Sequence, residues 1–172
     1  MPEPSSPHPT DGEVGVAVIG AGYWGPNLVR NFLACDDTWL WAVCDLDLDR
    51  ARKVVGKRTS VHTTTDLQEI LDDPRIEAVA IATPAATHLP IALAAIAAGK
   101  HILVEKPLAL SAADARTIAE AADAAGLVAM CDHTFCYTPA VNRIRSEIAD
   151  GNLGRIQYVD SVRINLGLEP RD

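Results

Sequence analysis

Hydrophobic positions in the first three quarters of the chain form short apolar runs, separated by longer segments in which apolar residues recur every three or four positions. The apolar runs predict buried strands. The recurrence of apolar residues every three or four positions in the longer segments predicts helices. The expected strands cover residues 14–19, 40–44, 61–63, 78–82, 101–104 and 128–131. The expected helices cover residues 26–35, 49–56, 88–98 and 111–126, with a shorter one that Thr65 and Asp66 cap and that reaches Leu71. Glu69 stands where it would complete a capping box in this short helix. The regular alternation predicts an α/β domain with a doubly wound parallel sheet over residues 14–133.

The pattern changes after residue 133. Residues 138–150 predict one more helix, and residues 155–164 alternate in polarity as a long strand does. Such a strand needs a partner, and the last eight residues offer none. We therefore expect residues 134–172 to be a linking helix and the first strand of an incomplete, truncated α+β second domain. Residues 1–13, with four prolines among the first nine, are expected to form a disordered tail.

The composition and net charge of the chain disfavour some classes of binding partner. The chain is 48% hydrophobic and 22% charged, with a net charge of −8, which is typical of a globular domain and unfavourable for binding nucleic acid or anionic membranes. Its longest apolar stretches are too short to span a bilayer, and no secretory signal opens the chain. A cytoplasmic protein is expected. The four cysteines form no Cys-x-x-Cys pair, so free thiols are expected and no metal site is predicted.

The strongest local motif directly follows the first predicted strand and precedes a predicted helix. It reads Gly20-Ala-Gly22-Tyr23-Trp24-Gly25. In this context Gly20 permits a tight turn, Gly22 lets a dinucleotide diphosphate approach the backbone, and Gly25 lets helix and strand pack closely. An ordinary glycine-rich loop is the alternative interpretation.

Asp45 ends the second predicted strand, about twenty residues after the glycines. A carboxylate there accepts hydrogen bonds from the adenosine ribose and repels a 2′-phosphate, which favours NAD over NADP. Arg50 and Arg52 follow on the next helix, and because their positive charges could bind a 2′-phosphate, NADP remains an alternative cofactor. The alternative is that Asp45 only begins a turn.

Two further segments close predicted strands at the same edge of the sheet. Thr83-Pro84 ends the fourth strand, and His88 after it either faces the cofactor or caps the next helix. Glu105-Lys106-Pro107 follows the fifth strand. An ammonium at that position can hydrogen-bond a substrate hydroxyl and assist its deprotonation. From spacing alone, a surface lysine is the default interpretation.

Taken together, several segments resemble the Gfo/Idh/MocA oxidoreductase family from residue 14 to about residue 168. These segments read GAGYWGPNLVRNF, VCDLD, ATPAATH, AGKHILVEKPLA, HTFCYTPAV and LGRIQYVDSVRINLGL. Within the family, the sequence is most similar to nucleotide-sugar dehydrogenases of bacterial polysaccharide biosynthesis, such as UDP-N-acetylglucosamine 3-dehydrogenases. The Glu105-Lys106-Pro107 context is more specific than the glycine motif, which many folds share.

The resemblance implies a role for each matching position. Lys106 matches the family's catalytic lysine, whose peptide bond to the following proline is commonly cis. The residues that border the nicotinamide and substrate are Lys106, His133, Thr134 and Tyr137. The implied cofactor-binding residues are Gly20, Gly22, Tyr23, Trp24, Gly25, Asp45, Thr83, Pro84, His88, Glu105 and Lys106.

One feature departs from the family pattern. Members continue into a large, mostly antiparallel sheet that forms the substrate pocket and usually an oligomer interface, with an Asp and a His early in that half. This sequence has no equivalent segment. The expected function is thus the nucleotide-binding part of an NAD(P)-dependent oxidoreductase that oxidises a hydroxyl of a sugar or nucleotide sugar, homo-oligomeric in its full-length form. The alternative is an inactive dinucleotide-binding module or truncated gene product that acts through a partner.

Overall fold

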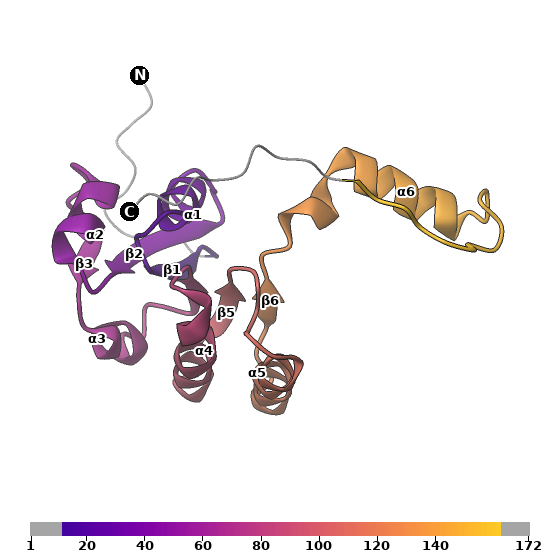
Figure 1. Ribbon diagram of the computed structural model, residues 1–172. Helices are drawn as coiled ribbons and strands as arrows, with labels where there is room; N and C mark the ends of the chain where they lie inside the picture. Colours follow the sequence, from indigo (N-terminus) through magenta and orange to yellow (C-terminus); the bar gives the residue numbers. More distant parts are fainter. Residues whose placement is uncertain (1–11, 163–172) are drawn as a thin grey trace, which may run out of the picture. The chain divides into compact units, whose positions relative to one another are not determined.

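The computed structural model describes residues 12–162 (Figure 1). The chain divides into two compact units, residues 1–133 and residues 134–172. Each unit is considered by itself.

A six-stranded parallel sheet forms the centre of the first unit (Figure 1). The strands lie in the order β3-β2-β1-β4-β5-β6. Their bounds are β1 Val14–Ile19, β2 Thr38–Cys44, β3 His62–Thr64, β4 Ala78–Ile81, β5 His101–Val104 and β6 Ala129–Cys131. Because the order reverses at the β1–β4 pair, this is a doubly wound, Rossmann-type sheet, and the predicted fold class is confirmed.

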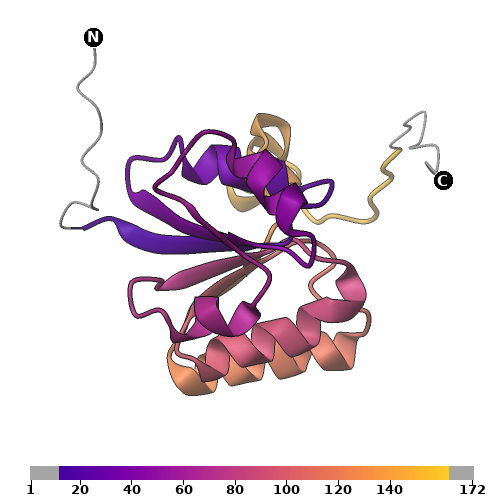
Figure 2. The same ribbon diagram turned by 90° about the vertical axis from the view of Figure 1, so that its left-hand side faces the viewer.

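Helices cover both faces of the sheet, and each face has its own hydrophobic core. The helices are α1 Gly25–Phe32, α2 Leu48–Val55, α3 Leu67–Asp72, α4 His88–Ala97 and α5 Ala112–Ala125, with a 3₁₀ turn at Ala85–Thr87. Figure 2 shows α1 and α2 above the sheet and α4 and α5 below it. Buried residues of α1 and α2 pack with Val18 and Val43, whereas those of α3, α4 and α5 pack with Ala17 and Ile19. Alternate residues of β1 thus serve opposite cores, as strand geometry requires.

The start of α3 differs from the sequence prediction. Asp66 caps the helix, since its Oδ1 accepts a hydrogen bond from the Gln68 backbone N–H at 2.8 Å. Glu69 does not complete a capping box. The Asp66 N–H that it would need donates to Thr64 Oγ1 at 3.0 Å, and the Glu69 carboxylate instead contacts His62 Nε2 at 2.9 Å.

The second unit begins with a 3₁₀ turn, Thr134–Tyr137, and continues with α6, Pro139–Ala149. The predicted strand at 155–164 is not formed over residues 155–162, and residues 163 and 164 lie outside the described residues. A strand is stabilised by hydrogen bonds to a neighbouring strand, and none of the described residues provides one here. The alternating pattern by itself therefore does not produce a strand.

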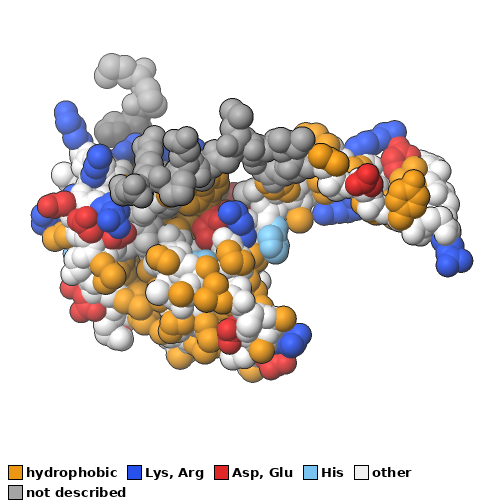
Figure 3. All heavy atoms as spheres, in the orientation of Figure 1, with side chains coloured by type: hydrophobic (Ala, Val, Ile, Leu, Met, Phe, Trp, Pro, Cys, Tyr) orange, Lys and Arg blue, Asp and Glu red, His pale blue; other side chains and the backbone are white. Residues whose placement is uncertain are grey.

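Apolar side chains also gather on the surface of the first unit. Figure 3 shows them over the region of α4 and α5, beside the edge strand β6. Val128 and Met130 of this edge are exposed.

Within residues 12–162, every helix is too short or too polar to cross a bilayer.

Candidate functional site

The predicted site residues of the first unit meet at one edge of the sheet. In a parallel sheet the carboxyl ends of all strands lie at the same edge, and ligands bind where the strand order reverses. The segments that leave this edge are the glycine loop after β1, Asp45 after β2, Thr83-Pro84 after β4, Glu105-Lys106-Pro107 after β5 and Asp132-His133 after β6.

Two of the three motif glycines are required by the packing of the chain itself. Gly20 has a positive φ of 98°, and a Cβ there would lie 2.7 Å from the Ala82 carbonyl group. A Cβ on Gly25 would lie 2.1 Å from the Gly20 carbonyl oxygen. No side chain fits at either place, so the loop can close only with glycine at both positions.

Gly22 is different, because no packing contact within residues 12–162 requires a glycine there. A Cβ at this position would have none of the described atoms within 4 Å, and its φ is not in the left-handed region. It lies just before α1, whose first backbone N–H groups lack partners within the helix. A bare backbone that faces open space next to a helix N-terminus fits a dinucleotide diphosphate.

The neighbouring Tyr23 is 78% exposed, and its ring centroid lies 6.4 Å from that of the partly exposed Trp24. Both aromatic side chains of the motif are therefore at the surface of the glycine loop. Their predicted contact with a cofactor stays a prediction.

Asp45 connects the second strand to the glycine loop. Its side chain is almost buried, with 8% exposed, and Oδ2 accepts a hydrogen bond from the Ala21 N–H at 2.7 Å. Oδ1 accepts one from the Asp47 N–H at 2.8 Å. Asp45 thus begins a turn and also holds the glycine loop, and its predicted contact with the ribose stays a prediction. A carboxylate has about four lone-pair directions, which leaves room for a ribose hydroxyl.

Arg50 and Arg52, which left NADP as an alternative cofactor, have different surroundings. Arg50 reaches the site, with Nη1 3.3 Å from Asp45 Oδ1 and Nη2 3.6 Å from Asp47 Oδ2. Arg52 instead pairs with Asp49 on the exposed side of α2, at 3.5 Å. Of the two, Arg50 is the one that contacts Asp45, and it forms ion pairs with two carboxylates, those of Asp45 and Asp47.

Glu105 is a buried carboxyl group at the end of β5, with only 7% of the residue exposed. Its Oε2 accepts a hydrogen bond from the Lys106 N–H at 3.2 Å. Burial first, and then the adjacent Asp132 carboxyl, raise the pKa of Glu105 from 4.5 to about 7. The two carboxyl groups can share a hydrogen bond only while one of them is protonated. Glu105 is therefore an acid that titrates near neutral pH beside Lys106.

We expect the stability of the chain to fall as pH rises from about 4.5 to 7, because the folded state holds the Glu105 proton that the unfolded state releases. The loss amounts to about 3 kcal/mol at most. Glu105→Gln, which cannot ionise, should show a much weaker decline in urea-unfolding free energy between pH 5 and pH 8. Glu120→Gln on exposed α5 is the control and should follow the wild type. Parallel pH curves for Glu105→Gln and the wild type would show that this carboxyl does not titrate near 7.

Lys106 is exposed at the same edge, and its peptide bond to Pro107 is cis, as the resemblance implies. Within residues 12–162, no hydrogen bond or ion pair engages its ammonium group. The side chain is therefore available to a substrate oxygen.

His88 makes contacts that its sequence position did not suggest. Its ring is buried, with 1% of the residue exposed, and its predicted role in binding the cofactor stays a prediction. It does not cap α4, because Thr87 holds the N-cap position. Instead Nδ1 lies 2.9 Å from the Pro107 carbonyl oxygen and Nε2 lies 2.9 Å from the Thr83 carbonyl oxygen. The sequence alone does not show that the His88 ring contacts a carbonyl group 19 residues further along the chain. Thr83 and Pro84 themselves stay at the edge of the sheet, where they were predicted.

The remaining predicted residues divide between the two units. His133 is exposed after β6, with Nε2 3.5 Å from Cys131 Sγ. Burial first, and then the Asp132 charge, raise the pKa of the Cys131 thiol, so this pair is not an activated thiolate. Thr134 and Tyr137 belong to the 3₁₀ turn of the second unit. No cluster of metal ligands occurs within residues 12–162, and the four cysteines are free thiols.

Asp132 is the site residue that the sequence prediction missed. It directly follows β6, just as Asp45 follows β2, and its N–H donates to the Val104 carbonyl at 2.8 Å. Asp45 was predicted because it is a carboxylate at the carboxyl end of a parallel strand. The same reasoning would have identified Asp132 at the end of β6.

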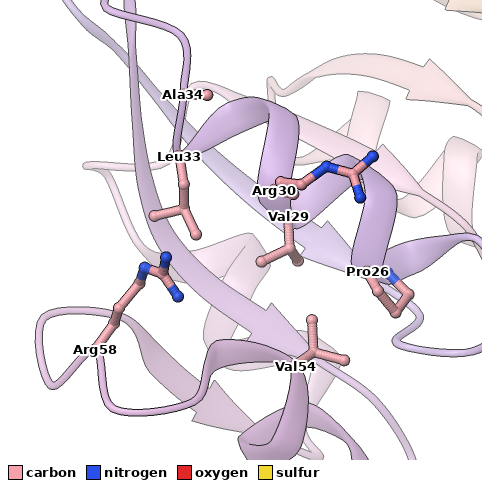
Figure 4. Close-up of a pocket in the computed structure, with 7 residues that line it drawn as sticks. All are labelled: Pro26, Val29, Arg30, Leu33, Ala34, Val54 and Arg58. Carbon is pink, nitrogen blue, oxygen red and sulfur yellow. The ribbon is translucent and has the colours of Figure 1, made fainter.

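A hollow of about 290 Å³ lies elsewhere, between α1 and the end of α2 (Figure 4). It is lined by Pro26, Val29, Arg30, Leu33, Ala34, Val54 and Arg58. None of the predicted site residues is among them. The predicted site residues therefore do not line this hollow.

A family model described as an oxidoreductase family with an NAD-binding Rossmann fold matches residues 14–133, more than two thirds of the chain. The chain belongs to the Gfo/Idh/MocA oxidoreductase family. Its first unit is the NAD-binding fold of that family, and the prediction of NAD as cofactor is confirmed at this level.

Relatives in the family include dehydrogenases with different substrates. The chain is 34% identical over 145 residues to 4-carboxy-2-hydroxymuconate-6-semialdehyde dehydrogenase of Sphingobium sp. strain NBRC 103272 / SYK-6, covering 84% of this chain and 46% of the relative. The structure of GenD2 from gentamicin A biosynthesis in complex with NAD matches with a TM-score of 0.77 at 39% identity, covering 84% of this chain and 41% of GenD2. The UDP-N-acetylglucosamine 3-dehydrogenase GnnA of Acidithiobacillus ferrooxidans matches with a TM-score of 0.71 at 28% identity, covering 78% and 43%. The Gfo/Idh/MocA chain described here thus spans less than half the length of these relatives.

Proposed function

We propose that this chain is the cofactor-binding part of an NAD-dependent dehydrogenase that oxidises a hydroxyl group of a sugar or nucleotide sugar. The observation that carries the proposal is Gly22, a glycine that faces open space beside the N-terminus of α1. Lys106 supports it, since its ammonium is exposed at the same edge of the sheet. The family match to residues 14–133 supports the oxidoreductase class.

Each residue contributes one part of the reaction. The backbone around Gly22 binds the diphosphate, and Asp45 accepts a ribose hydroxyl. When bound, NAD supplies the acceptor for a hydride at C4 of its nicotinamide. Lys106 Nζ hydrogen-bonds the substrate hydroxyl and, as the free amine, takes its proton while the carbon loses hydride and becomes a carbonyl. Glu105 is buried directly before Lys106 in the chain, and its Oε2 accepts a hydrogen bond from the Lys106 backbone N–H at 3.2 Å, which helps to hold the turn that presents the lysine.

A nucleotide sugar of the UDP-N-acetylglucosamine type, used in polysaccharide biosynthesis, is our more specific proposal. It is supported by the Glu105-Lys106-Pro107 context and by the likeness to GnnA. We further propose that residues 134–172 begin the substrate and oligomerisation region of a homo-oligomer, and that the enzyme works in the cytoplasm. The alternative is a catalytically inactive dinucleotide-binding module that acts through a partner.

The test is an assay of the polypeptide as its source cells make it, with NAD and a panel of UDP-sugars and free sugars. Formation of NADH is followed by its absorbance. We expect NADH to form with at least one sugar of the panel, fastest with a UDP-sugar. Saturable NADH binding without turnover of any sugar would reject the dehydrogenase and leave the inactive module.

A further inference from the structure

The pairing of β5 with β6 places two acidic residues next to each other at the site edge of the sheet. The two strands are parallel, with Val104 opposite Cys131. The next residue in each strand direction is an acid, Glu105 after β5 and Asp132 after β6. A backbone hydrogen bond continues the ladder at this point, because the Asp132 N–H donates to the Val104 carbonyl oxygen at 2.8 Å. The register of the sheet therefore makes the two carboxyl groups neighbours.

The buried Glu105 side chain has a donor for only one of its two oxygens. Oε2 accepts a hydrogen bond from the Lys106 backbone N–H at 3.2 Å. Oε1 is buried, and no donor within residues 12–162 reaches it. A buried oxygen without a donor is costly, and the side chain that can hydrogen-bond Glu105 is another carboxyl group, that of Asp132. Since ionised carboxylates only accept hydrogen bonds, Asp132 can hold Glu105 only through a shared proton.

The other charges near Glu105 do not replace this contact. The elements packed against β5 are β4, β6 and α4. Residues 78–84, which form β4 and the turn after it, carry no charged side chain. Burial first, and then Asp132, raise the pKa of Glu105 to about 7, whereas the Lys106 charge acts in the opposite direction. The titratable residues at this end of the neighbouring segments are Lys106 on the same turn, His88 on α4, and Cys131, Asp132 and His133 at the end of β6.

We propose that Asp132 is a positioning residue, which acts through Glu105 to hold the turn that presents Lys106. Asp132 fixes the Glu105 side chain, and Glu105 Oε2 in turn holds the Lys106 backbone N–H. Asp132 itself touches neither cofactor nor substrate. The consequence for catalysis rests on the proposed dehydrogenase function, whereas the contact between the two carboxyl groups and its effect on the turn do not.

This arrangement works only below a certain pH. Glu105 releases its proton near pH 7, because its pKa is raised to about that value. Above this pH the shared hydrogen bond is lost, and two neighbouring carboxylates repel each other. The turn that carries Lys106 is then held less firmly. An asparagine in place of Asp132 has nearly the same shape, but its amide group can donate to Glu105 without a shared proton.

The first measurement is an NMR titration of the chain labelled with ¹⁵N and, at the glutamate carboxyl carbons, with ¹³C. We expect the Glu105 midpoint, near pH 7 in the wild type, to fall by at least about one pH unit in Asp132→Asn. The Lys106 amide proton, which donates to Glu105 Oε2, should shift with the Glu105 midpoint in both proteins. Glu120, exposed on α5, is the internal reference, and its titration should be the same in both proteins.

Two results of this titration would each overturn the proposal, whatever the chain catalyses. The first is a Glu105 midpoint that is the same in the wild type and in Asp132→Asn. The second is a wild-type Lys106 amide proton that does not follow the titration of Glu105. The second result needs no variant, so it stands even if the substitution disturbs folding.

The second measurement is the pH profile of kcat for sugar oxidation by the polypeptide as its source cells make it. At about pH 6.5 we expect Asp132→Ala to lower kcat about tenfold with little change in KM for NAD, because the turn is no longer held. Asp132→Asn should stay within about threefold of the wild type at that pH. The ratio of wild-type kcat to Asp132→Asn kcat should then fall about threefold or more by pH 8.5, where only the wild type has two neighbouring carboxylates.

Asp123→Asn is the matched control, because it removes an exposed carboxylate from α5, and it should leave kcat and its pH profile unchanged. Equal kcat of Asp132→Ala and the wild type at every pH would show that Asp132 does not position Lys106. A ratio of wild-type to Asp132→Asn kcat that is constant with pH would exclude the shared proton. Absence of turnover in the wild type would remove the proposed function, and the NMR titration would then decide the proposal by itself.

Discussion

We expect the Lys106→Met variant to lose about a thousandfold in kcat while its affinity for NADH stays within about threefold of the wild type. Methionine has a side chain of similar length and flexibility, but it can neither donate nor accept a proton. Lys106 is exposed at the carboxyl end of β5, so its removal should not disturb the core. The measurement is sugar oxidation by the polypeptide as its source makes it, alongside an NADH titration of both proteins.

Lys53→Met is the matched control for this variant. Lys53 is also exposed, but it lies in the last turn of α2, away from the β5 turn. Its replacement should change neither kcat nor NADH affinity. A Lys106→Met enzyme with wild-type kcat would show that Lys106 is an ordinary surface lysine, which the spacing alone also allows.

The second large effect is expected at Gly22. A valine there would place methyl groups where the diphosphate approaches the backbone, and Kd for NADH should rise about 100-fold, or about 2.7 kcal/mol. The thermal midpoint should hardly change, because a Cβ at this position meets no protein atom within 4 Å. Fluorescence titration and a thermal melt of the same sample separate the two quantities.

Gly25→Ala is the informative comparison. Its Cβ would lie 2.1 Å from the Gly20 carbonyl oxygen, so the variant should lose about 2 kcal/mol of stability through forced displacement of the loop. The two glycines thus separate a ligand requirement from a packing requirement. Unchanged NADH affinity in Gly22→Val would mean that the glycine loop does not hold the diphosphate.

Much of the first unit follows from its sequence because the signals are local. Each of the six strands was expected within about two residues of its observed bounds, since buried parallel strands are short, apolar and flanked by turn residues. The positions of Asp45 and Lys106 at the sheet edge followed from the same reasoning. The family match confirms the oxidoreductase class and the Rossmann fold that the motifs indicated.

The failures share a physical cause, which is that the decisive contact is distant in the chain. His88 lies at the start of α4, but the contact of its ring with the Pro107 carbonyl, 19 residues away, could not be read from its position. Glu69 fits a capping box locally, yet His62 competes for its carboxylate. Residues 155–162 alternate like a strand without becoming one, because pairing depends on a second strand and not on the pattern. The raised pKa of Glu105 comes first from burial in the fold and then from Asp132, 27 residues further on.

The central claim is that the carboxyl edge of this sheet binds NAD, and a fluorescence titration of the chain with NADH tests it most directly. We predict saturable binding of one NADH per chain with Kd in roughly the micromolar range. NADPH should bind at least about tenfold more weakly, because Asp45 repels a 2′-phosphate and already neutralises Arg50. A folded chain, verified by circular dichroism, that shows no saturable binding up to millimolar NADH would contradict the account.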